Sequence, residues 1–421
     1  MRSIRPDALI AGLACALALG ACGESPSAPN GQPAELTSLP RALTTAERQV
    51  VGAANAFSFS LWNRLVAVQR DSNVFVSPLS ASFALGMTLN GAANQTYDEM
   101  RSALQFGTAT QHDINDGFHS LIALIAMLDP SVTTGIANSI WYRNTFTFSQ
   151  AFFDTTRTYF DAEVSGLNFA DATGSLAAIN GWVNTKTHGV IPAVVDRIDD
   201  STVMFLINAI YFNGSWREKF DLAATRDATF LTSNGAMQPM RLMHRTADML
   251  YTESPMWQAV DLPYGNGAFT MTVVLPTAAS DVEAVAASLT AGAWASLTAA
   301  LTKREVDLSL PKLRLTYDRL LNDDLKALGM VVPFVGDVAD FTRMSPAGDH
   351  LFISLVKQKA FVDVNEEGTQ AAAATTVEVG TTSAPVATVM RVDHPYVFVL
   401  RERLTGTVLF MGKVTAMPSG A

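Results

Sequence analysis

The sequence contains two Ser-x-x-Lys pairs whose spacing fits nucleophilic catalysis. In such a pair the lysine amine can take the proton from the serine hydroxyl. They are Ser309 with Lys312 and Ser354 with Lys357. A serine hydrolase of the penicillin-binding type also needs a Lys-Thr-Gly sequence, and none follows either pair. A Tyr-Arg-Asn sequence at 142–144 precedes both serines instead of following them. Chance spacing within strand-like runs is the better explanation, and a serine hydrolase is the weakest of three hypotheses.

Other reactive constellations are absent from the sequence. There is no Gly-x-Ser-x-Gly elbow, His-Glu-x-x-His helix or Walker loop, and the six histidines are scattered with no pair at metal-ligand spacing. The net charge of −10 comes without a block of Lys or Arg, which argues against nucleic-acid binding. We therefore expect a protein that is not an enzyme, needs no metal or cofactor and binds no nucleic acid.

The most unusual stretch is residues 366–383, which combine a strand pattern with loop chemistry. From residue 369 on, small or branched residues alternate with polar or neutral ones, the first set being Thr369, Ala371, Ala373, Thr375, Val377 and Val379. Gly368 interrupts the pattern in front, and Gly380 and Pro385 interrupt it behind. Alanine is a poor strand former, so the segment has little drive to pair by itself. It is interpreted as a loop that can become a strand; a flexible linker or one turn of helix is the alternative.

The rest of the chain supplies a large body to hold this loop. It has 421 residues, of which 48% are hydrophobic and 16% charged, which predicts a folded core. Helical spacing of apolar residues predicts a helix over 46–68, and Pro78 fits the first turn of another. Apolar runs at 204–216, 271–276 and 306–312 predict strands, the first of them fully buried.

Residues 1–21 are typical of an export signal. Arg2 and Arg5 precede an apolar stretch at 8–21 that is too short to span a bilayer. Residues 19–22, Leu-Gly-Ala-Cys, resemble a bacterial lipobox, which predicts cleavage before Cys22 and a lipid on its thiol; an ordinary secretory peptide is the alternative. Residues 22–45 are then a flexible tether. We expect an exported protein, anchored in the outer membrane through Cys22 or extracellular, whose body after residue 22 contains no cysteine.

A family resemblance covers about residues 46–418. Residues 359–370, Lys-Ala-Phe-Val-Asp-Val-Asn-Glu-Glu-Gly-Thr-Gln, followed by four alanines, resemble the hinge of the serpins, serine-protease inhibitors that act by loop insertion. Residues 393–398 and 405–414 are similar to the closing strands of that family, and 204–216 to its central strand. The resemblance implies one α+β domain over 46–418, with a large, mainly antiparallel five-stranded central sheet, two smaller sheets, about eight or nine helices and an exposed reactive loop at about 366–390.

The resemblance also assigns conformational roles to particular residues. The hinge would comprise Glu366, Glu367, Gly368, Thr369, Gln370, Ala371, Ala372, Ala373 and Ala374. The cluster at which the central sheet opens would comprise Ser77, Ser80, Asn208 and Gln358, and the top of the sheet Trp216, Lys312 and Glu366. Many members carry histidine where this chain has Gln358, and because glutamine does not titrate we expect a pH-insensitive cluster.

The scissile bond is placed by counting along the loop. Sixteen residues beyond Glu366 lies Thr382, which predicts cleavage between Thr382 and Ser383; Thr381 and Ala384 remain open, since counting back from Pro395 gives Ala384. All are small and uncharged, which favours an elastase-like or subtilisin-like target. The resemblance thus implies a monomeric suicide inhibitor that forms a covalent acyl complex with a serine protease. The alternative is a non-inhibitory binding or scaffold lipoprotein. A proline or a charged residue within 369–377 would favour that alternative, and neither occurs there.

Overall fold

The computed structural model describes residues 33–369 and 387–418. The chain divides into a short unit, Met1–Ala34, and a compact unit, Glu35–Ala421, and all elements below belong to the second. The predicted signal peptide and Cys22 lie outside the described residues. Among the helices of the described ranges, none combines the length and apolar character that crossing a membrane requires.

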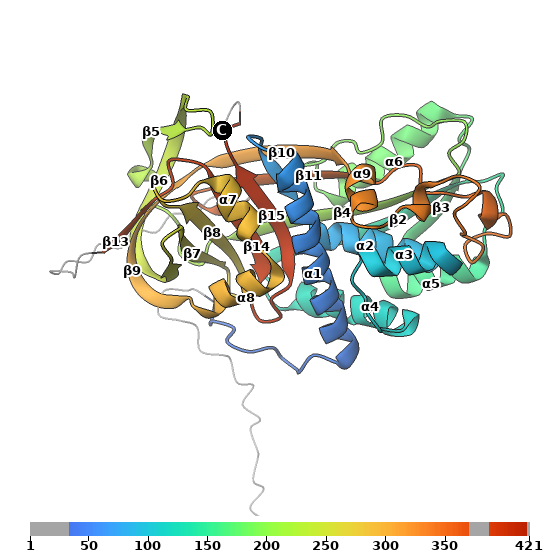
Figure 1. Ribbon diagram of the computed structural model, residues 1–421, viewed down its shortest axis with the longest axis horizontal. Helices are drawn as coiled ribbons and strands as arrows, with labels where there is room; N and C mark the ends of the chain where they lie inside the picture. Colours follow the sequence, from blue (N-terminus) through green and yellow to red (C-terminus); the bar gives the residue numbers. More distant parts are fainter. Residues whose placement is uncertain (1–32, 370–386, 419–421) are drawn as a thin grey trace, which may run out of the picture. The chain divides into compact units, whose positions relative to one another are not determined.

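The described residues form nine α-helices (Figure 1). Local signals explain where the first two begin: a Thr44–Glu47 capping box opens α1, and the Ser77 side chain caps α2 ahead of Pro78. Both helices therefore start where the sequence predicts. The helices are α1 Thr45–Val68, α2 Pro78–Leu89, α3 Asn94–Ala103, α4 Gln111–Met127, α5 Gln150–Phe160, α6 Ala172–Lys186, α7 Val282–Ser288, α8 Ala291–Ala299 and α9 Asn322–Ala327.

The central sheet has six strands in the described part of the chain, one more than predicted. Their order is β10 (Leu313–Leu320), β11 (Lys357–Asn365), β12 (Gly368–Thr369), β4 (Met204–Ser215), β2 (Val132–Arg143) and β3 (Glu163–Leu167). The additional strand, β12, is the first part of the predicted loop. The prediction of a mainly antiparallel sheet is confirmed, and the pair β2–β3 is its one parallel pairing among these strands.

The predicted two smaller sheets are joined into one nine-stranded network. The long strand β6 links them, because it pairs with β5 and β9 and, through its last four residues, with β7. The strands are β1 Val74–Val76, β5 Arg226–Leu231, β6 Met237–Glu253, β7 Trp257–Tyr264, β8 Phe269–Pro276, β9 Thr302–Pro311, β13 Thr388–Arg391, β14 Tyr396–Glu402 and β15 Val408–Val414.

Helices cover both faces of the central sheet (Figure 1). On one face α2 joins the main core, in which Leu206 of β4 is partly buried. On the other face α6 and the residues after it form a smaller core, to which β4 contributes Ile207. Neighbouring residues of β4 therefore point into different cores, as strand alternation requires.

The segment before α1 contacts the body, although the sequence predicts a tether as far as residue 45. The backbone N–H of Leu36 donates to the Asn266 carbonyl at 2.8 Å, and the Arg403 guanidinium donates to the Leu36 carbonyl at 2.5 Å. Arg41 forms an ion pair with the buried Glu47. Residues 36–45 thus differ from a free linker.

Candidate functional site: the loop hinge and the gap in the central sheet

Glu366, the first residue of the predicted hinge, is held by a cation and a hydroxyl. Its carboxylate accepts from Lys312 Nζ at 2.8 Å and from Thr225 Oγ1 at 2.9 Å. Burial by itself would raise the pKa of Glu366, but the hydrogen bond from Lys312 and those from the backbone and Thr225 outweigh it and leave the pKa lowered. The carboxylate is therefore charged at neutral pH, and the ion pair fixes the chain where it leaves β11.

Trp216 clamps the same turn from the end of β4. Its ring N–H donates to the Asn365 carbonyl and its backbone N–H donates to the Glu367 carbonyl, each at 2.8 Å. The ring stacks on Tyr264, with centroids 4.4 Å apart. The structure thus brings together the three residues predicted for the top of the sheet, Trp216, Lys312 and Glu366.

The next two residues, Gly368 and Thr369, form β12 and already lie between β11 and β4. Gly368 pairs with Ser215 and Thr369 with Gly214 on one side, and with Asn365 and Val364 on the other. Gly368 has φ +153°, and a Cβ there would lie 2.1 Å from the Gly214 carbonyl oxygen. A residue without Cβ is therefore required where the hinge enters the sheet.

Thr369 points into the main core. Its side chain is buried, and Oγ1 lies 2.7 Å from the Tyr264 hydroxyl. Burial raises the pKa of Tyr264, which therefore stays a neutral partner. The remaining hinge residues, Gln370 and Ala371 to Ala374, and all four candidates for the scissile bond, Thr381 to Ala384, lie outside the described residues.

The four residues predicted to form the sheet-opening cluster gather at the N-terminus of α2. Gln358 of β11 accepts from the Ser77 backbone N–H at 2.9 Å and donates to the Ser77 carbonyl at 2.7 Å. The Ser80 hydroxyl donates to the Asn208 amide oxygen of β4, and Asn208 donates to Asn138 of β2 at 2.7 Å. The helix therefore holds β11 through Ser77 and β4 through Ser80.

Three contributors to this site were missed from the sequence. Asn138 extends the polar cluster by donating to the Phe160 carbonyl at 2.6 Å, and Thr225 and Tyr264 support the hinge. Asn138 is itself buried in β2, where a polar side chain needs a partner. Thr225 and Tyr264 stand more than a hundred residues from the hinge in a turn and a strand end, and no local pattern marks them.

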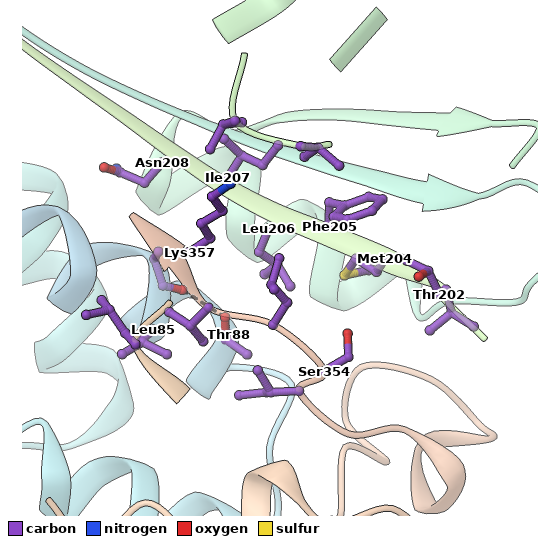
Figure 2. Close-up of a pocket in the computed structure, with 18 of the residues that line it drawn as sticks. Leu85, Thr88, Thr202, Met204, Phe205, Leu206, Ile207, Asn208, Ser354 and Lys357 are labelled. Atoms are coloured by element: carbon purple, nitrogen blue, oxygen red, sulfur yellow. Dashed lines mark hydrogen bonds between the residues drawn. The ribbon is translucent and has the colours of Figure 1, made fainter. Parts of the chain in front are cut away.

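Below β12 the central sheet has a gap. No pairing joins β4 to β11 among the described residues, and a cavity of about 220 Å³ lies there (Figure 2). It is lined by the first half of β4, by α2 and by residues 350–359. Because Thr369 is opposite both Gly214 and Val364, stepping seven residues back along β4 and β11 puts Ile207 and Lys357 at one level. The cavity therefore lies between the same two strands that flank β12, further along them.

The two ends of the loop are fixed in different sheets. Thr369 ends β12 in the central sheet, whereas Thr388 begins β13, which pairs with β9 in the nine-stranded network. The Ser-x-x-Lys pairs show no hydrolase geometry: Lys312 binds Glu366, and Lys357 binds Asp196 and Asp318. Groups of three or more His, Cys, Asp or Glu able to hold a metal do not occur in the described ranges.

Comparison with known proteins decides the family. The family model described as serpin (serine protease inhibitor) matches residues 52–417. The chain belongs to the serpin family. The leukocyte elastase inhibitor of Sus scrofa is 34% identical over 380 residues, covering 87% of this chain and 99% of the relative. Human serpin B8 is also 34% identical, over 371 residues, covering 86% and 98%.

Solved serpin structures show the same fold. The thermophilic serpin tengpin, in its native state, is 29% identical, with a TM-score of 0.81 and coverage of 91% of this chain and 98% of that chain. Human thyroxine-binding globulin, solved with its hormone, is 24% identical, with a TM-score of 0.82 and coverage of 89% and 100%. The predicted family and fold class are therefore confirmed. Among these relatives the fold occurs both in a protein named as an elastase inhibitor and in one named as thyroxine-binding.

Proposed function

We propose that this serpin is a suicide inhibitor of serine proteases, which traps its target by inserting the cut loop into the central sheet. The observation that carries the proposal is β12: Gly368 and Thr369 of the loop already pair with β4 and β11, and further along the same two strands, from Asn208 and Lys359, lies an unfilled gap. The residues that follow are uncharged through Val377 and, after Gln370, small or β-branched, so none brings a charge between the two strands.

The reaction begins as ordinary acyl transfer. The protease serine attacks the carbonyl carbon of Thr382, the bond to the nitrogen of Ser383 breaks, and the amine of Ser383 leaves with a proton. Residues 370–382 then follow Gly368 and Thr369 into the gap while still ester-linked to the protease. At about 3.3 Å per residue, these thirteen residues carry the protease roughly 40 Å, and its active site is distorted before water can cleave the ester.

The register of β12 assigns the faces of the inserted strand. Since Thr369 points into the main core, alternation directs residues 371, 373, 375, 377 and 379 to the same side. This is the face that carries small residues first and Val377 and Val379 last. Each buried valine contributes about 1.5–3 kcal/mol by leaving water.

The gap itself provides part of the driving force. At about 24 cal/mol per Å³, an unfilled cavity of 220 Å³ corresponds to at most about 5 kcal/mol of lost packing. Filling it with a strand recovers that packing and adds ladder hydrogen bonds on both sides. The form with the loop outside is accordingly the less stable of the two.

The target is proposed to be an elastase-like or subtilisin-like enzyme, because Thr381, Thr382, Ser383 and Ala384 are all small and uncharged. Similarity to a leukocyte elastase inhibitor supports the same class. A lipid on Cys22 would place the inhibitor at the outer membrane or, if the chain is released, outside the cell. Mass spectrometry of the N-terminal peptide from expressing bacteria tests this anchor, and an unmodified Cys22 would refute it.

The test of function is a denaturing gel after mixing the chain with elastase or subtilisin, with mass spectrometry of the released C-terminal peptide. A band that survives denaturant, at the summed mass minus that peptide, supports trapping and fixes the scissile bond. Clean cleavage near Thr382 by every protease tried, with no such band, would refute inhibition and favour the binding or scaffold protein as the alternative.

A further inference from the structure

Lys357 forms ion pairs on two sides at the foot of β11. Its Nζ lies 2.6 Å from Asp196 Oδ2 and 3.2 Å from Asp318 Oδ2, and its side chain is only 18% exposed. Gln358, the next residue, binds Ser77 of α2, so alternation directs Lys357 to the opposite face, the one covered by α6. Lys357, the first residue of β11, therefore contacts the layer formed by α6 and the segment after it.

Asp196 belongs to the connecting segment 187–203, which leads from α6 into β4. The segment is fixed to the helix by Asn180, whose Oδ1 accepts from the N–H groups of Val194 and Val195 at 2.9 and 3.0 Å. The Asn180 amide also donates to the Val195 carbonyl at 2.8 Å. Asp196 therefore moves with α6 and with the start of β4, on the far side of the gap from β11.

The pair Lys357–Asp196 consequently crosses the gap. Lys357 is level with Ile207 of β4, and Figure 2 shows its side chain extending from β11 toward that strand. A strand that enters between β4 and β11 from the Ser215 end passes this level about two thirds of the way along β4, beneath the connecting segment. Asp318 differs, because it lies on β10, the neighbour of β11 on the side away from the gap.

We propose that the Lys357–Asp196 ion pair is a latch that holds the connecting segment 187–203 against β11 and slows insertion of the loop. The proposal rests on the proposed function, since it names a positioning residue for the same insertion step. Asp318 steadies Lys357 but does not close the gap. The loop strand must separate β11 from the segment at this level, so the ion pair must break before insertion is complete.

Both partners are charged at neutral pH. The hydrogen bond from Lys357 lowers the pKa of Asp196, and the hydrogen bonds to Asp196 and Asp318 outweigh burial and raise the pKa of Lys357. Because the Asp196 side chain is 75% exposed, solvent and salt weaken the attraction. An exposed pair of this kind changes an equilibrium or a rate by about two- to fivefold, which sets the size of the effect to look for.

The test uses the full-length chain and three variants, Lys357→Met, Asp196→Asn and the double variant. The first readout is the amide hydrogen-exchange rate of peptides from residues 187–203, which needs no protease. We expect this rate to rise by about two- to fivefold in all three variants. The second is the ratio of cleaved to trapped inhibitor on a denaturing gel. It is expected to fall by the same factor, because faster insertion competes better with deacylation, and the double variant should match the single ones.

Two matched controls separate the latch from loss of charge in general. Asp318→Asn removes the other partner of the same lysine, and Lys303→Met breaks an exposed pair with Asp248, 3.2 Å apart, on the β6–β9 ladder. Both should leave exchange of residues 187–203 and the cleaved-to-trapped ratio unchanged.

Unchanged exchange in Lys357→Met and Asp196→Asn would overturn the latch, as would faster exchange with an unchanged cleaved-to-trapped ratio. An effect of Asp318→Asn as large as that of Asp196→Asn would overturn it too, since position across the gap would then be irrelevant. A wild-type chain that never forms a covalent band refutes the proposed function instead, and exchange of residues 187–203 still decides whether the ion pair holds the segment.

Discussion

Replacing Thr369 by arginine places a long cation at the point where the loop enters the sheet. In the structure the Thr369 side chain is 3% exposed, and its hydroxyl contacts Tyr264, which itself stacks on Trp216. The Glu366 carboxylate already binds Lys312 and Thr225, so it is not free to pair with an added cation. An arginine here must either bury an unpaired charge or leave the sheet.

The expected magnitude follows from the cost of burying that charge. An uncompensated ion in a protein interior costs several kcal/mol even after relaxation. With 3 kcal/mol as a lower figure and about 1.4 kcal/mol per decade, insertion slows by at least about a hundredfold. Deacylation is not altered, since the scissile bond lies thirteen residues away in the sequence at Thr382. Thr369→Arg should therefore be cut as a substrate rather than retained in a complex.

Gln370→Arg is the matched control, because it adds the same side chain one residue later on the opposite face of the inserted strand. The assay is the fraction of protease trapped at equal inhibitor concentration, read from a denaturing gel. We expect Thr369→Arg to lose nearly all covalent complex and Gln370→Arg to retain most of it. Full trapping by Thr369→Arg, or equal losses in both variants, would refute the assigned hinge and its faces.

Three further predictions concern the N-terminus of α1 and two supports of the site. Glu47→Gln, which removes the charge paired with Arg41, should lower the unfolding free energy by about 2 kcal/mol at pH 7. Because the pKa of Glu47 is lowered to about 2, this stabilisation is complete above pH 4.5 and fades as pH falls toward 2, where wild type and variant converge. Gln358→His should introduce pH dependence: only neutral imidazole accepts from the Ser77 N–H, so about 1 kcal/mol is lost below pH ~6.5. Gly368→Ala should push β12 out from between its neighbours and raise its amide exchange at least about tenfold.

Each of these has a result that would contradict it. For Glu47→Gln it is a denaturation midpoint difference that stays constant from pH 7 to pH 2.5. For Gln358→His it is a thermal midpoint as flat between pH 8 and 5.5 as that of the wild type. For Gly368→Ala it is wild-type exchange in a peptide that covers residues 366–369, with Gly107→Ala as a control, since a Cβ at Gly107 meets no other atom within 4 Å.

The sequence predicted the parts of the fold that depend on local pattern. Helix α1 and the start of α2 follow from apolar spacing, Ser77 and Pro78, and the apolar run at 204–216 is β4. The prediction that this strand is fully buried is wrong, because Met204, Phe205 and Leu206 line the gap and are only partly buried. The ion pair of Lys312 with Glu366 and the grouping of Ser77, Ser80, Asn208 and Gln358 came from the family resemblance rather than from spacing. Their side chains do meet in the structure.

The parts that were not predicted depend on contacts between distant segments. Apolar residues stand at helical spacing over 320–334, but the structure has the short α9 at Asn322–Ala327 and a 3₁₀ turn at Val332–Phe334. Gly329, with φ +96°, interrupts the helical run between them, and Pro333 lies in the 3₁₀ turn. The support of the hinge by Tyr264, and the reach of Lys357 to Asp196, join residues 105 and 161 positions apart, which no window along the chain can detect.

The pairings of β12 have a consequence for the direction of the conformational change. Both β11 and β4 run antiparallel to β12, and they are therefore parallel to each other. If the gap closed without the loop, the sheet would gain one parallel ladder, whereas entry of the loop creates two antiparallel ones, which are slightly more stable per residue. Strand polarity alone therefore biases the molecule toward the inserted state, and once that state forms, both ladders must be broken together to reverse it.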